Sequence, residues 1–386
     1  MKIVLFVTGL QLGGAETQVA DLARGFLARG HDVTLISVTG PCTIALPQSP
    51  RFTLIELKAG KSPGALLGAM FRFVAYLREW QPDVVHAHMV HANLMARVAR
   101  WFVRMPVLVS SAHSRNEGGR ARMLAYRLTD RWTDLTTNVS DDAVAAFVAQ
   151  GAAPAERIVS MPNGIDTRRY RPDAQVRSHW REMLLGQKQA DVDASTNANA
   201  ATPIVFAAGR MVEAKDYPTL IDAFAHVLNT LPDARLFIAG DGPLRTQIQA
   251  RVEARGVSDA ATLLGRRNDV AQLMCAADLY VMSSAWEGLP LVIGEAMASG
   301  LPIVSTDCGG VRELTGETRH NTLVPVGDAG ALGDALLHHL RAAPDERLAA
   351  GDANRQRIDE RYSLDAIVTR WIETYTSLRD ARRAGV

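Results

Sequence analysis

The chain has 386 residues, more than a single hydrophobic core usually holds, so we expect two domains. Its composition is that of an ordinary α/β protein, with 47% hydrophobic and 22% charged residues, and its formal net charge of +1 gives no reason to expect nucleic acid as a partner. The three cysteines are odd in number and widely spaced (Cys42, Cys275 and Cys308), which argues against a disulfide framework or a zinc site and favours a reducing compartment.

The first predicted element is a buried parallel strand, because residues 2–7 form a continuous apolar run. The strand enters the stretch GLQLGGAET (residues 9–17), which opens an apolar-periodic helix that ends near Ala28. A glycine loop between a strand and a helix is suited to facing a phosphate group, so Gly13 and Gly14 are candidate binding residues. The alternative is that these glycines only shape the turn.

A strand that runs into a glycine turn is not the pattern of a secretory signal. No stretch of the sequence approaches the roughly 18 consecutive apolar residues that a membrane-spanning helix needs. We therefore expect a cytoplasmic protein.

Strands and helices then alternate along the first half of the chain. We expect strands at residues 32–38, 52–57, 83–87, 106–110, 135–139 and 158–161, and helices at residues 63–80, 92–103, 119–131 and 140–150. This alternation predicts a parallel, doubly wound sheet with helices on both faces. The turn sequence PNGID at residues 162–166 is a candidate crossing point into a second domain.

A second alternating series begins near residue 203. We expect its strands at residues 203–208, 234–239, 262–264, 279–283, 303–306 and 321–326, and its helices at residues 217–231, 244–255, 270–276, 290–299, 329–340, 345–360 and 364–383. Between the two series, residues 187–202 are rich in Ala, Asn, Asp and Thr, so we expect a mobile surface insertion there. The predicted fold class is α/β, with two doubly wound domains.

Two glutamates flank the start of the helix predicted at Pro290. Glu287 precedes a Gly-Leu-Pro turn, and Glu295 lies about one turn into the helix. The free amides and the dipole of a helix N-terminus attract an anion, whereas carboxylates repel phosphate and suit hydroxyl groups. A sugar nucleotide, with phosphate in the middle and polyols on both sides, fits this pattern. The alternative is two solvated acids at a chance spacing.

Five short motifs occur in an order that resembles the GT-B-fold retaining glycosyltransferases of family 4. The motifs are GGAE (residues 13–16), MPNGIDTRRY (161–170), GRMVEAKDY (209–217), E-x7-E (287–295) and GGVRE (309–313). The resemblance covers nearly the whole chain. It implies two Rossmann-like domains that face each other across a cleft: residues 1–165 would bind the acceptor, residues 166–363 would bind the nucleotide sugar, and residues 364–386 would pack back on the first domain.

The resemblance gives donor-binding roles to three basic residues. Arg210 and Lys215 match the basic pair that clamps the donor diphosphate, where positive charge stabilises the negative charge that grows on the leaving group. Arg266, in GRRNDV (residues 265–270), lies where the family's base-binding segment usually falls. The alternative for all three residues is solvated surface charge.

The resemblance assigns the two glutamates to different parts of the donor. Glu287 matches the acid that bonds hydroxyl groups of the transferred sugar, and Glu295 matches the acid that bonds the nucleotide ribose. The four residues that follow Glu287 would contact the phosphate or the sugar: Gly288, Leu289, Pro290 and Leu291.

The resemblance assigns a catalytic role to Glu287 and to one histidine. His113 follows the strand expected at residues 106–110 and matches the family's active-site histidine, which would orient or polarise the transferred sugar. His86, His88 and His91 lie nearby in the sequence and compete for this role.

The resemblance implies a hexosyltransferase that retains the anomeric configuration and needs no metal or other cofactor. The leaving phosphate would help to take the acceptor's proton, and the two glutamates would not form a glycosidase pair because both hold the donor. The donor would be a UDP- or GDP-sugar. The acceptor would be a glycan or a lipid-linked molecule of cell-surface polysaccharide or glycolipid synthesis.

One region of the first domain is rich in arginine. Residues 91–132 contain eight arginines against two acids, with Trp101, Phe102, Met105 and Met123 between them. Such a mixture suits an anionic membrane surface or a lipid diphosphate, so the protein would lie peripherally at the inner face of the membrane. The alternative is two solvated helices whose apolar residues face inward.

Two further functions compete with glycosyl transfer. One is a GT-B-fold epimerase acting on a sugar nucleotide, and the other is a non-catalytic relative that only binds one. The E-x7-E pattern disfavours the first, and the presence of all four matched residues (Arg210, Lys215, Glu287 and Glu295) disfavours the second.

Overall fold

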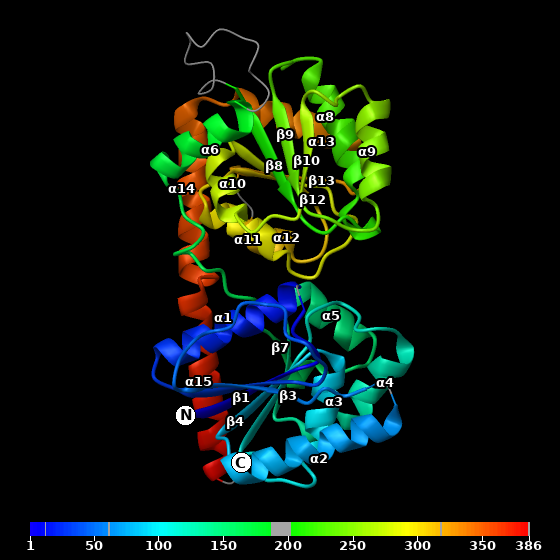
Figure 1. The fold of residues 1–386 in the computed structure, drawn as a ribbon, viewed down its shortest axis with the longest axis vertical. Coiled ribbons are helices and arrows are strands. Elements are labelled where there is room, and N and C mark those ends of the chain that lie inside the picture. Colours follow the sequence, from blue (N-terminus) through cyan, green and yellow to red (C-terminus); the bar gives the residue numbers. More distant parts are fainter. Residues whose placement is uncertain (12, 61, 187–201, 317–318, 385–386) are drawn as a thin grey trace. The chain divides into compact units, whose positions relative to one another are not determined.

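The computed structural model describes residues 1–11, 13–60, 62–186, 202–316 and 319–384. The chain forms two compact units, coloured along the sequence in Figure 1. Unit 1 consists of Met1–Gly164 and Tyr362–Val386, and unit 2 consists of Ile165–Arg361. The insertion predicted at residues 187–202 lies, apart from Thr202, outside the described residues.

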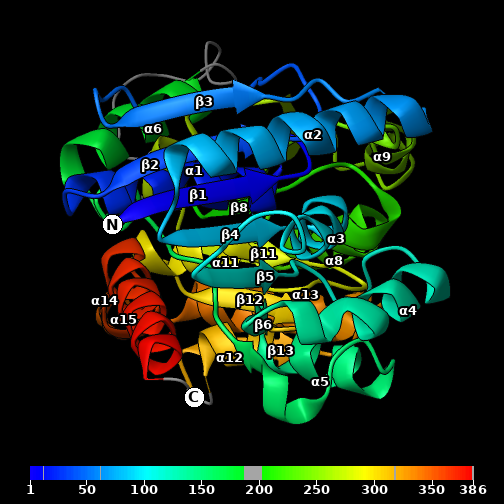
Figure 2. The same ribbon diagram turned by 90° about the horizontal axis from the view of Figure 1, so that it is seen from below.

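The described residues of unit 1 form a seven-stranded parallel sheet in the order β3-β2-β1-β4-β5-β6-β7. The strands are β1 (Lys2–Val7), β2 (Asp32–Ser37), β3 (Phe52–Glu56), β4 (Val84–His88), β5 (Val107–Ser111), β6 (Leu135–Asn138) and β7 (Ile158–Ser160). The helices are α1 (Gly14–Ala28), α2 (Pro63–Trp80), α3 (Val90–Ala99), α4 (Arg120–Thr129), α5 (Asp141–Ala149) and α15 (Leu364–Arg383). Figure 2 shows the strands side by side, from β3 to β6.

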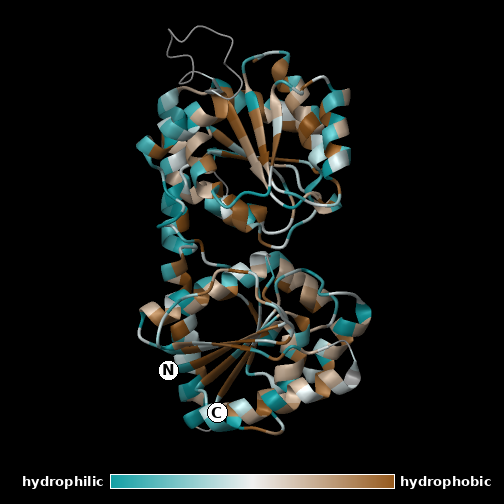
Figure 3. Cartoon of the chain, in the orientation of Figure 1, coloured by the Kyte–Doolittle hydropathy of each residue, from teal (hydrophilic) through white to brown (hydrophobic). Residues whose placement is uncertain are grey.

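Both faces of this sheet are covered, which explains why β1 is apolar at successive positions. Leu5 packs in a core with side chains of α1 and α15, whereas Phe6 packs in a core with side chains of α2 and α3. Phe6 stacks on Phe73 of α2 with ring centroids 4.1 Å apart. Figure 3 shows the strands as hydrophobic and the helices around them as mixed hydrophobic and hydrophilic. Burial of each such side chain contributes about 1.5–3 kcal/mol.

The last helix, α15, belongs to unit 1 although it follows unit 2 in the sequence. Val368, Trp371 and Tyr375 of α15 are buried in the same core as Val19 and Phe26 of α1. Arg29, just after α1, donates a hydrogen bond of 2.8 Å to the Asp365 carboxylate. The C-terminal helix is therefore part of the hydrophobic core of unit 1.

The described residues of unit 2 form a six-stranded parallel sheet in the order β10-β9-β8-β11-β12-β13. The strands are β8 (Ile204–Ala208), β9 (Arg235–Ala239), β10 (Ala261–Gly265), β11 (Leu279–Met282), β12 (Ile303–Thr306) and β13 (Asn321–Val324). The helices are α6 (Ala174–Gly186), α8 (Tyr217–Leu228), α9 (Arg245–Ala254), α10 (Val270–Ala276), α11 (Leu291–Ala298), α12 (Val311–Thr315), α13 (Ala329–Arg341) and α14 (Pro344–Arg361).

The structure confirms the α/β prediction, and the expected strands and helices are present with small shifts at their ends. Helix α6 was not expected. It docks through buried charge: Arg181 is 5% exposed and its guanidinium lies 3.0 Å from the Asp278 carboxylate. The helix also carries an apolar period (Val176, Trp180, Met183 and Leu184), so the sequence held a signal for α6 that was missed.

Two of the eight arginines in residues 91–132 are not exposed. Arg97 is fully buried and the Arg100 side chain is 14% exposed, because both bind carbonyl and carboxylate oxygens inside unit 1. Met105 and Met123 belong to the core. Within this stretch, all of which the structure describes, the exposed arginines are Arg104, Arg115, Arg120, Arg122, Arg127 and Arg131. No helix in the described part of the chain is long and apolar enough to cross a membrane.

Candidate active site

The loop between β11 and α11 in unit 2 (residues 283–290, the acid loop) carries Glu287, which forms an ion pair with Lys215 of the segment after β8. The Lys215 ammonium donates a hydrogen bond of 2.6 Å to the Glu287 carboxylate. The two side chains are 17% and 16% exposed. The Ser284 hydroxyl donates a second hydrogen bond, of 2.8 Å, to the same carboxylate oxygen. The charges of Lys215 and Glu287 therefore balance each other before any ligand binds.

Two glycines of the GGVRE motif hold this loop in place. Gly309 has φ +53°, and a Cβ at this position would overlap the carbonyl oxygen of Glu287. The Gly310 amide donates a hydrogen bond of 2.7 Å to the carbonyl of Gly288. Gly309 thus permits both the left-handed backbone and the close contact that the loop requires.

The predicted helix after this loop is present as α11, which begins at Leu291 with Pro290 as its N-cap. No side chain caps its first turn. Its first amides are therefore available to an anion. Glu295 lies one turn into α11 and is half-buried. The arrangement of the acid loop and helix agrees with the order expected from the sequence.

Arg210 and Lys215 lie on the segment that follows β8. Arg210 is exposed and forms no ion pair with the described residues. Its neighbour Met211 is fully buried, and the Met211 amide donates a hydrogen bond of 3.0 Å to the carbonyl of Asp241. Gly240, with φ +151°, lets the two backbones approach, because a Cβ there would overlap the carbonyl of Gly209. The loop after β9 thereby anchors the segment that carries Arg210.

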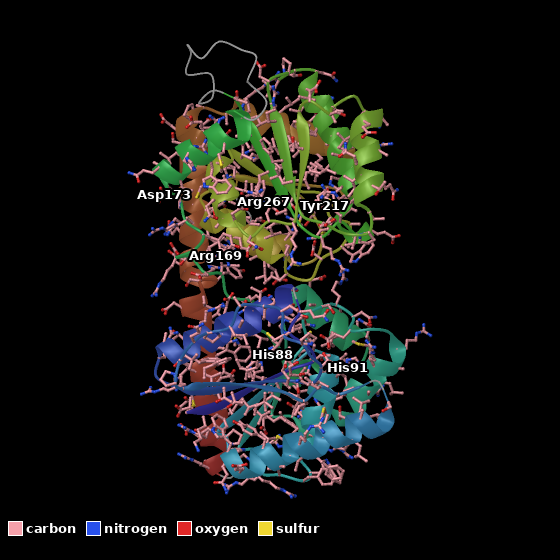
Figure 4. All side chains as sticks on the ribbon, viewed as in Figure 1. His88, His91, Arg169, Asp173, Tyr217 and Arg267 are labelled. Carbon is pink, nitrogen blue, oxygen red and sulfur yellow. The ribbon has the colours of Figure 1, made fainter. Side chains whose placement is uncertain are left out.

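This anchoring loop was not singled out in the sequence. Its signal is the pair of glycines in GDGP (residues 240–243), directly after a predicted strand. Tyr217, labelled in Figure 4, also supports the segment, because its hydroxyl donates a hydrogen bond of 3.0 Å to the carbonyl of Gly209. Burial raises the pKa of the Tyr217 hydroxyl, so it remains a hydrogen-bond donor at neutral pH.

Arg266 follows β10, and its side chain is exposed. The next residue, Arg267, donates a hydrogen bond of 2.8 Å to the Asp269 carboxylate. β10 pairs with β9, whereas Lys215 and Glu287 follow the neighbouring strands β8 and β11. The structure therefore brings Lys215 and Glu287 together and places Arg266 two strands away from β8.

Gly13, Gly14 and His113 belong to unit 1. Gly13 is the N-cap of α1 with an extended backbone, and the carboxylate of Glu16 folds back close to its Cα. Burial raises the pKa of the Glu16 carboxyl. Gly14 is the first residue of α1.

His113 lies just after β5 and is held on two sides. Its amide donates a hydrogen bond of 3.0 Å to the Glu117 carboxylate, which also accepts one of 2.5 Å from the Tyr126 hydroxyl. The Nε2 atom of His113 lies 3.1 Å from Nδ1 of His88. Burial lowers the pKa of His113 to about 4, so its imidazole is neutral at physiological pH.

The three competing histidines occupy different environments. His86 is fully buried, and its ring nitrogens lie 2.6 Å from the hydroxyls of Tyr375 and Ser111. His88 is 1% exposed and pairs with His113, whereas His91 is exposed on α3. The pairing of His88 with His113 was not expected. The spacing of His86 and His88 on one strand places both side chains on one face, but His113 lies 25 residues from His88, so their pairing has no local signal.

Within the described residues, no group of three or more His, Cys, Asp and Glu side chains is placed to hold a metal ion. The polar groups gathered at the acid loop are an ammonium, a carboxylate, a hydroxyl and the amides of α11. Such a set can bind a diphosphate next to hydroxyl groups.

Comparisons with known proteins identify the family of the chain. The sequence profile of the family described as Glycosyltransferase Family 4 matches residues 12–169, and that of Glycosyl transferases group 1 matches residues 202–342. Together the two profiles span more than half of the chain. Their order along the chain is the order of units 1 and 2.

Individual relatives are similar over most of their length. A UDP-Gal:alpha-D-GlcNAc-diphosphoundecaprenol alpha-1,3-galactosyltransferase of Escherichia coli is 25% identical over 79% of both chains. An N-acetyl-alpha-D-glucosaminyl L-malate synthase of Bacillus anthracis is 24% identical over the full length of both. The crystal structure of Anabaena HepE in complex with UDP covers 98% of this chain and 100% of its own, with 22% identity and a TM-score of 0.82.

The similarity to solved structures confirms the predicted GT-B fold. The two family profiles agree with the five sequence motifs, which lie within or beside the matched ranges. The chain belongs to the family 4, group 1 glycosyltransferases of GT-B fold.

Proposed function

We propose that this glycosyltransferase moves a sugar from a UDP- or GDP-sugar to a hydroxyl group of a glycan or lipid-linked acceptor, with retention of the anomeric configuration. The acceptor belongs to the synthesis of a cell-surface polysaccharide or glycolipid. The observation that carries the proposal is the Lys215–Glu287 pair, at 2.6 Å, beside the uncapped start of α11. Two comparisons support a nucleotide-sugar donor: HepE has been solved with UDP, and the E. coli relative is named for UDP-Gal.

In the proposed reaction the bond between the sugar C1 and the diphosphate oxygen breaks, and the electron pair stays on the diphosphate. Arg210, Lys215 and the first amides of α11 stabilise this charge, so the proposal involves no metal or other cofactor. The acceptor oxygen bonds to C1 on the same face, and its proton passes to the leaving phosphate oxygen. Glu287 bonds hydroxyl groups of the transferred sugar, and Glu295 bonds the ribose.

The assignment of Glu295 can be tested by calorimetric titration of UDP and GDP. We expect one of these nucleotides to bind the wild type and to bind the Glu295→Ala variant about 10- to 100-fold more weakly, because a charge-assisted hydrogen bond to the ribose is lost. Glu182→Ala removes an exposed acid from α6 and is the matched control, with unchanged affinity. Equal binding to both variants would contradict the ribose role of Glu295, and binding of neither nucleotide would contradict the donor class.

We further propose that unit 1 binds an anionic membrane surface through α3, α4 and the residues after them. Trp101 and Phe102 are 67% and 57% exposed, and Leu124 and Leu128 of α4 are 53% and 63% exposed. Leu124 and Leu128 are one helical turn apart, so they share a face of α4. The six exposed arginines of this region lie around these side chains in the sequence. Exposed apolar side chains among basic residues favour an interface with acidic lipids.

Vesicle sedimentation tests this membrane proposal. We expect the wild type to sediment with phosphatidylglycerol-containing vesicles and to be released by salt, and not to sediment with pure phosphatidylcholine vesicles. Leu124→Ser with Leu128→Ser should abolish sedimentation, whereas Leu348→Ser, which alters a side chain that is 65% exposed on α14, should not. Equal sedimentation of all variants would argue against the surface.

A further inference from the structure

The ammonium of Lys215 is bound to a carboxylate of its own chain. It donates a hydrogen bond of 2.6 Å to Oε1 of Glu287, and the Ser284 hydroxyl donates one of 2.8 Å to the same oxygen. Among the described residues, Lys215 and Glu287 form ion pairs only with each other. Ser284 is fully buried, and the side chains of the pair are 17% and 16% exposed, so water screens the attraction between the two charges only weakly.

Two contacts beside the pair fix the distance between its two segments. The Ala285 amide donates a hydrogen bond of 2.8 Å to the carbonyl of Ala214. The Ser283 hydroxyl donates one of 2.9 Å to the carbonyl of Lys215. The segment after β8 and the acid loop are therefore joined directly next to Lys215 and Glu287. This arrangement keeps the ammonium and the carboxylate within reach of each other, so the pair re-forms whenever a ligand no longer separates it.

A bare nucleoside diphosphate and a nucleotide sugar meet this pair differently. A diphosphate that takes the ammonium of Lys215 leaves the partly buried Glu287 carboxylate without its cation, which opposes binding. A sugar can offset this cost, because its hydroxyl groups donate to the carboxylate. Oε2 of Glu287 is suited to this contact, since the hydrogen bonds from Lys215 and Ser284 both reach Oε1 and Oε2 has no partner among the described residues.

We propose that Glu287 competes with the diphosphate for Lys215, so that the site selects nucleotides that carry a sugar over the bare nucleoside diphosphate. This inference rests on the proposed function, which places the diphosphate at Lys215 and the sugar at Glu287. The competition also favours product release. When the sugar has passed to the acceptor, Glu287 loses its hydroxyl partners, and the pair with Lys215 re-forms and displaces the diphosphate.

The Glu287→Gln variant tests the competition, because it keeps the size of the side chain and removes its charge. By calorimetry we expect UDP or GDP, whichever the wild type binds, to bind this variant about tenfold more tightly, since Lys215 is free to meet the diphosphate. UDP-glucose, UDP-galactose and GDP-mannose should gain less than their bare diphosphates, because an amide binds sugar hydroxyl groups more weakly than a carboxylate. Glu213→Gln, which removes an exposed acid two residues from Lys215, is the matched control, with affinities changed less than about twofold.

Release of the nucleotide is measured by stopped-flow displacement of its fluorescent mant derivative. We expect the mant nucleotide to dissociate about tenfold more slowly from Glu287→Gln than from the wild type, because the competing carboxylate is absent. Urea unfolding shows whether this variant is folded. Glu287→Asp keeps the charge but shortens the side chain by one methylene, so it should give a smaller change in the same direction if Glu287→Gln does not fold.

The Lys215→Met background separates competition from simple repulsion between the carboxylate and the diphosphate. Without the ammonium there is nothing to compete for, so Glu287→Gln should then raise the affinity for the bare diphosphate by no more than about threefold. An equal gain in both backgrounds would mean that Glu287 acts by repulsion alone and would overturn the proposal. Equal or weaker binding of the diphosphate to Glu287→Gln in the presence of Lys215 would overturn it as well.

Failure of this inference is distinguishable from failure of the proposed function. If the wild type binds UDP or GDP and Glu287→Gln does not bind it more tightly, the competition is refuted and the donor site of unit 2 stands. If the wild type binds neither nucleotide, the proposed donor class fails, and the inference fails with it.

Discussion

The Lys215→Met variant is expected to transfer sugar about 10²- to 10³-fold more slowly than the wild type, because a preorganised positive charge is lost where negative charge develops. The Lys215 ammonium lies 2.6 Å from the Glu287 carboxylate, and both side chains are largely shielded from water. Shielding strengthens the interaction of the ammonium with the diphosphate. Initial rates at saturating nucleotide sugar measure the effect.

A double-variant cycle separates catalysis from stability at this pair. Either Lys215→Met or Glu287→Gln alone leaves a partly buried charge unpaired, which costs up to about 3 kcal/mol of unfolding free energy. The combination removes both charges and should recover most of that stability without recovering the rate. Recovery of the rate in the double variant would mean that the pair serves only the fold. Arg251→Met with Asp222→Asn removes the two ion pairs that Asp222 of α8 forms, with Arg251 and Arg255, and is the control, with an unchanged rate.

The Arg97→Met variant is expected to lose about 3–5 kcal/mol of unfolding free energy. The buried Arg97 guanidinium donates to the Ser110 hydroxyl at 3.1 Å, the Tyr126 carbonyl at 3.0 Å and the Thr136 hydroxyl at 2.9 Å, and lies 3.9 Å from the Asp130 carboxylate. Methionine fills similar space but leaves these acceptors unpaired. Burial lowers the pKa of Arg97 to about 10, so the guanidinium remains charged at neutral pH.

Urea unfolding monitored by circular dichroism measures this loss. The control is Arg104→Met, which alters an exposed arginine near the end of α3 and should change the unfolding free energy by less than about 0.5 kcal/mol. Because the chain has two units, the unfolding transition of each unit is fitted separately. A change in Arg97→Met as small as that of the control would show that the buried network contributes nothing to stability.

Elements with a strong local pattern could be predicted from the sequence. β1 is continuous in apolar residues because helices cover both faces of its sheet, and α15 begins at Leu364 as expected because Ser363 caps it. The acid loop could be predicted for the same reason, because a turn, the N-terminus of a helix and a strand follow one another within residues 284–306. The local sequence is sufficient to predict these elements.

Contacts between distant residues could not be predicted in this way. Arg97 looked like one of eight surface arginines, and only its place on the buried face of α3 distinguishes it from Arg104. The hydrogen bond between His86 and Tyr375 joins residues 289 positions apart. The Gln18 amide has no local signal in the sequence, because only the folded structure shows that both its polar atoms are buried without a hydrogen-bond partner among the described residues.

The position of α15 in the chain has a consequence for synthesis on the ribosome. Unit 2 is one continuous segment, whereas the core of unit 1 needs Trp371 and Tyr375, which follow unit 2 in the sequence. Domains fold during translation once their residues have emerged, so unit 2 can fold while unit 1 still lacks a helix. A nascent chain therefore cannot complete the core of unit 1 until α15 has emerged from the ribosome, so the first domain depends on residues that are translated after the whole of the second.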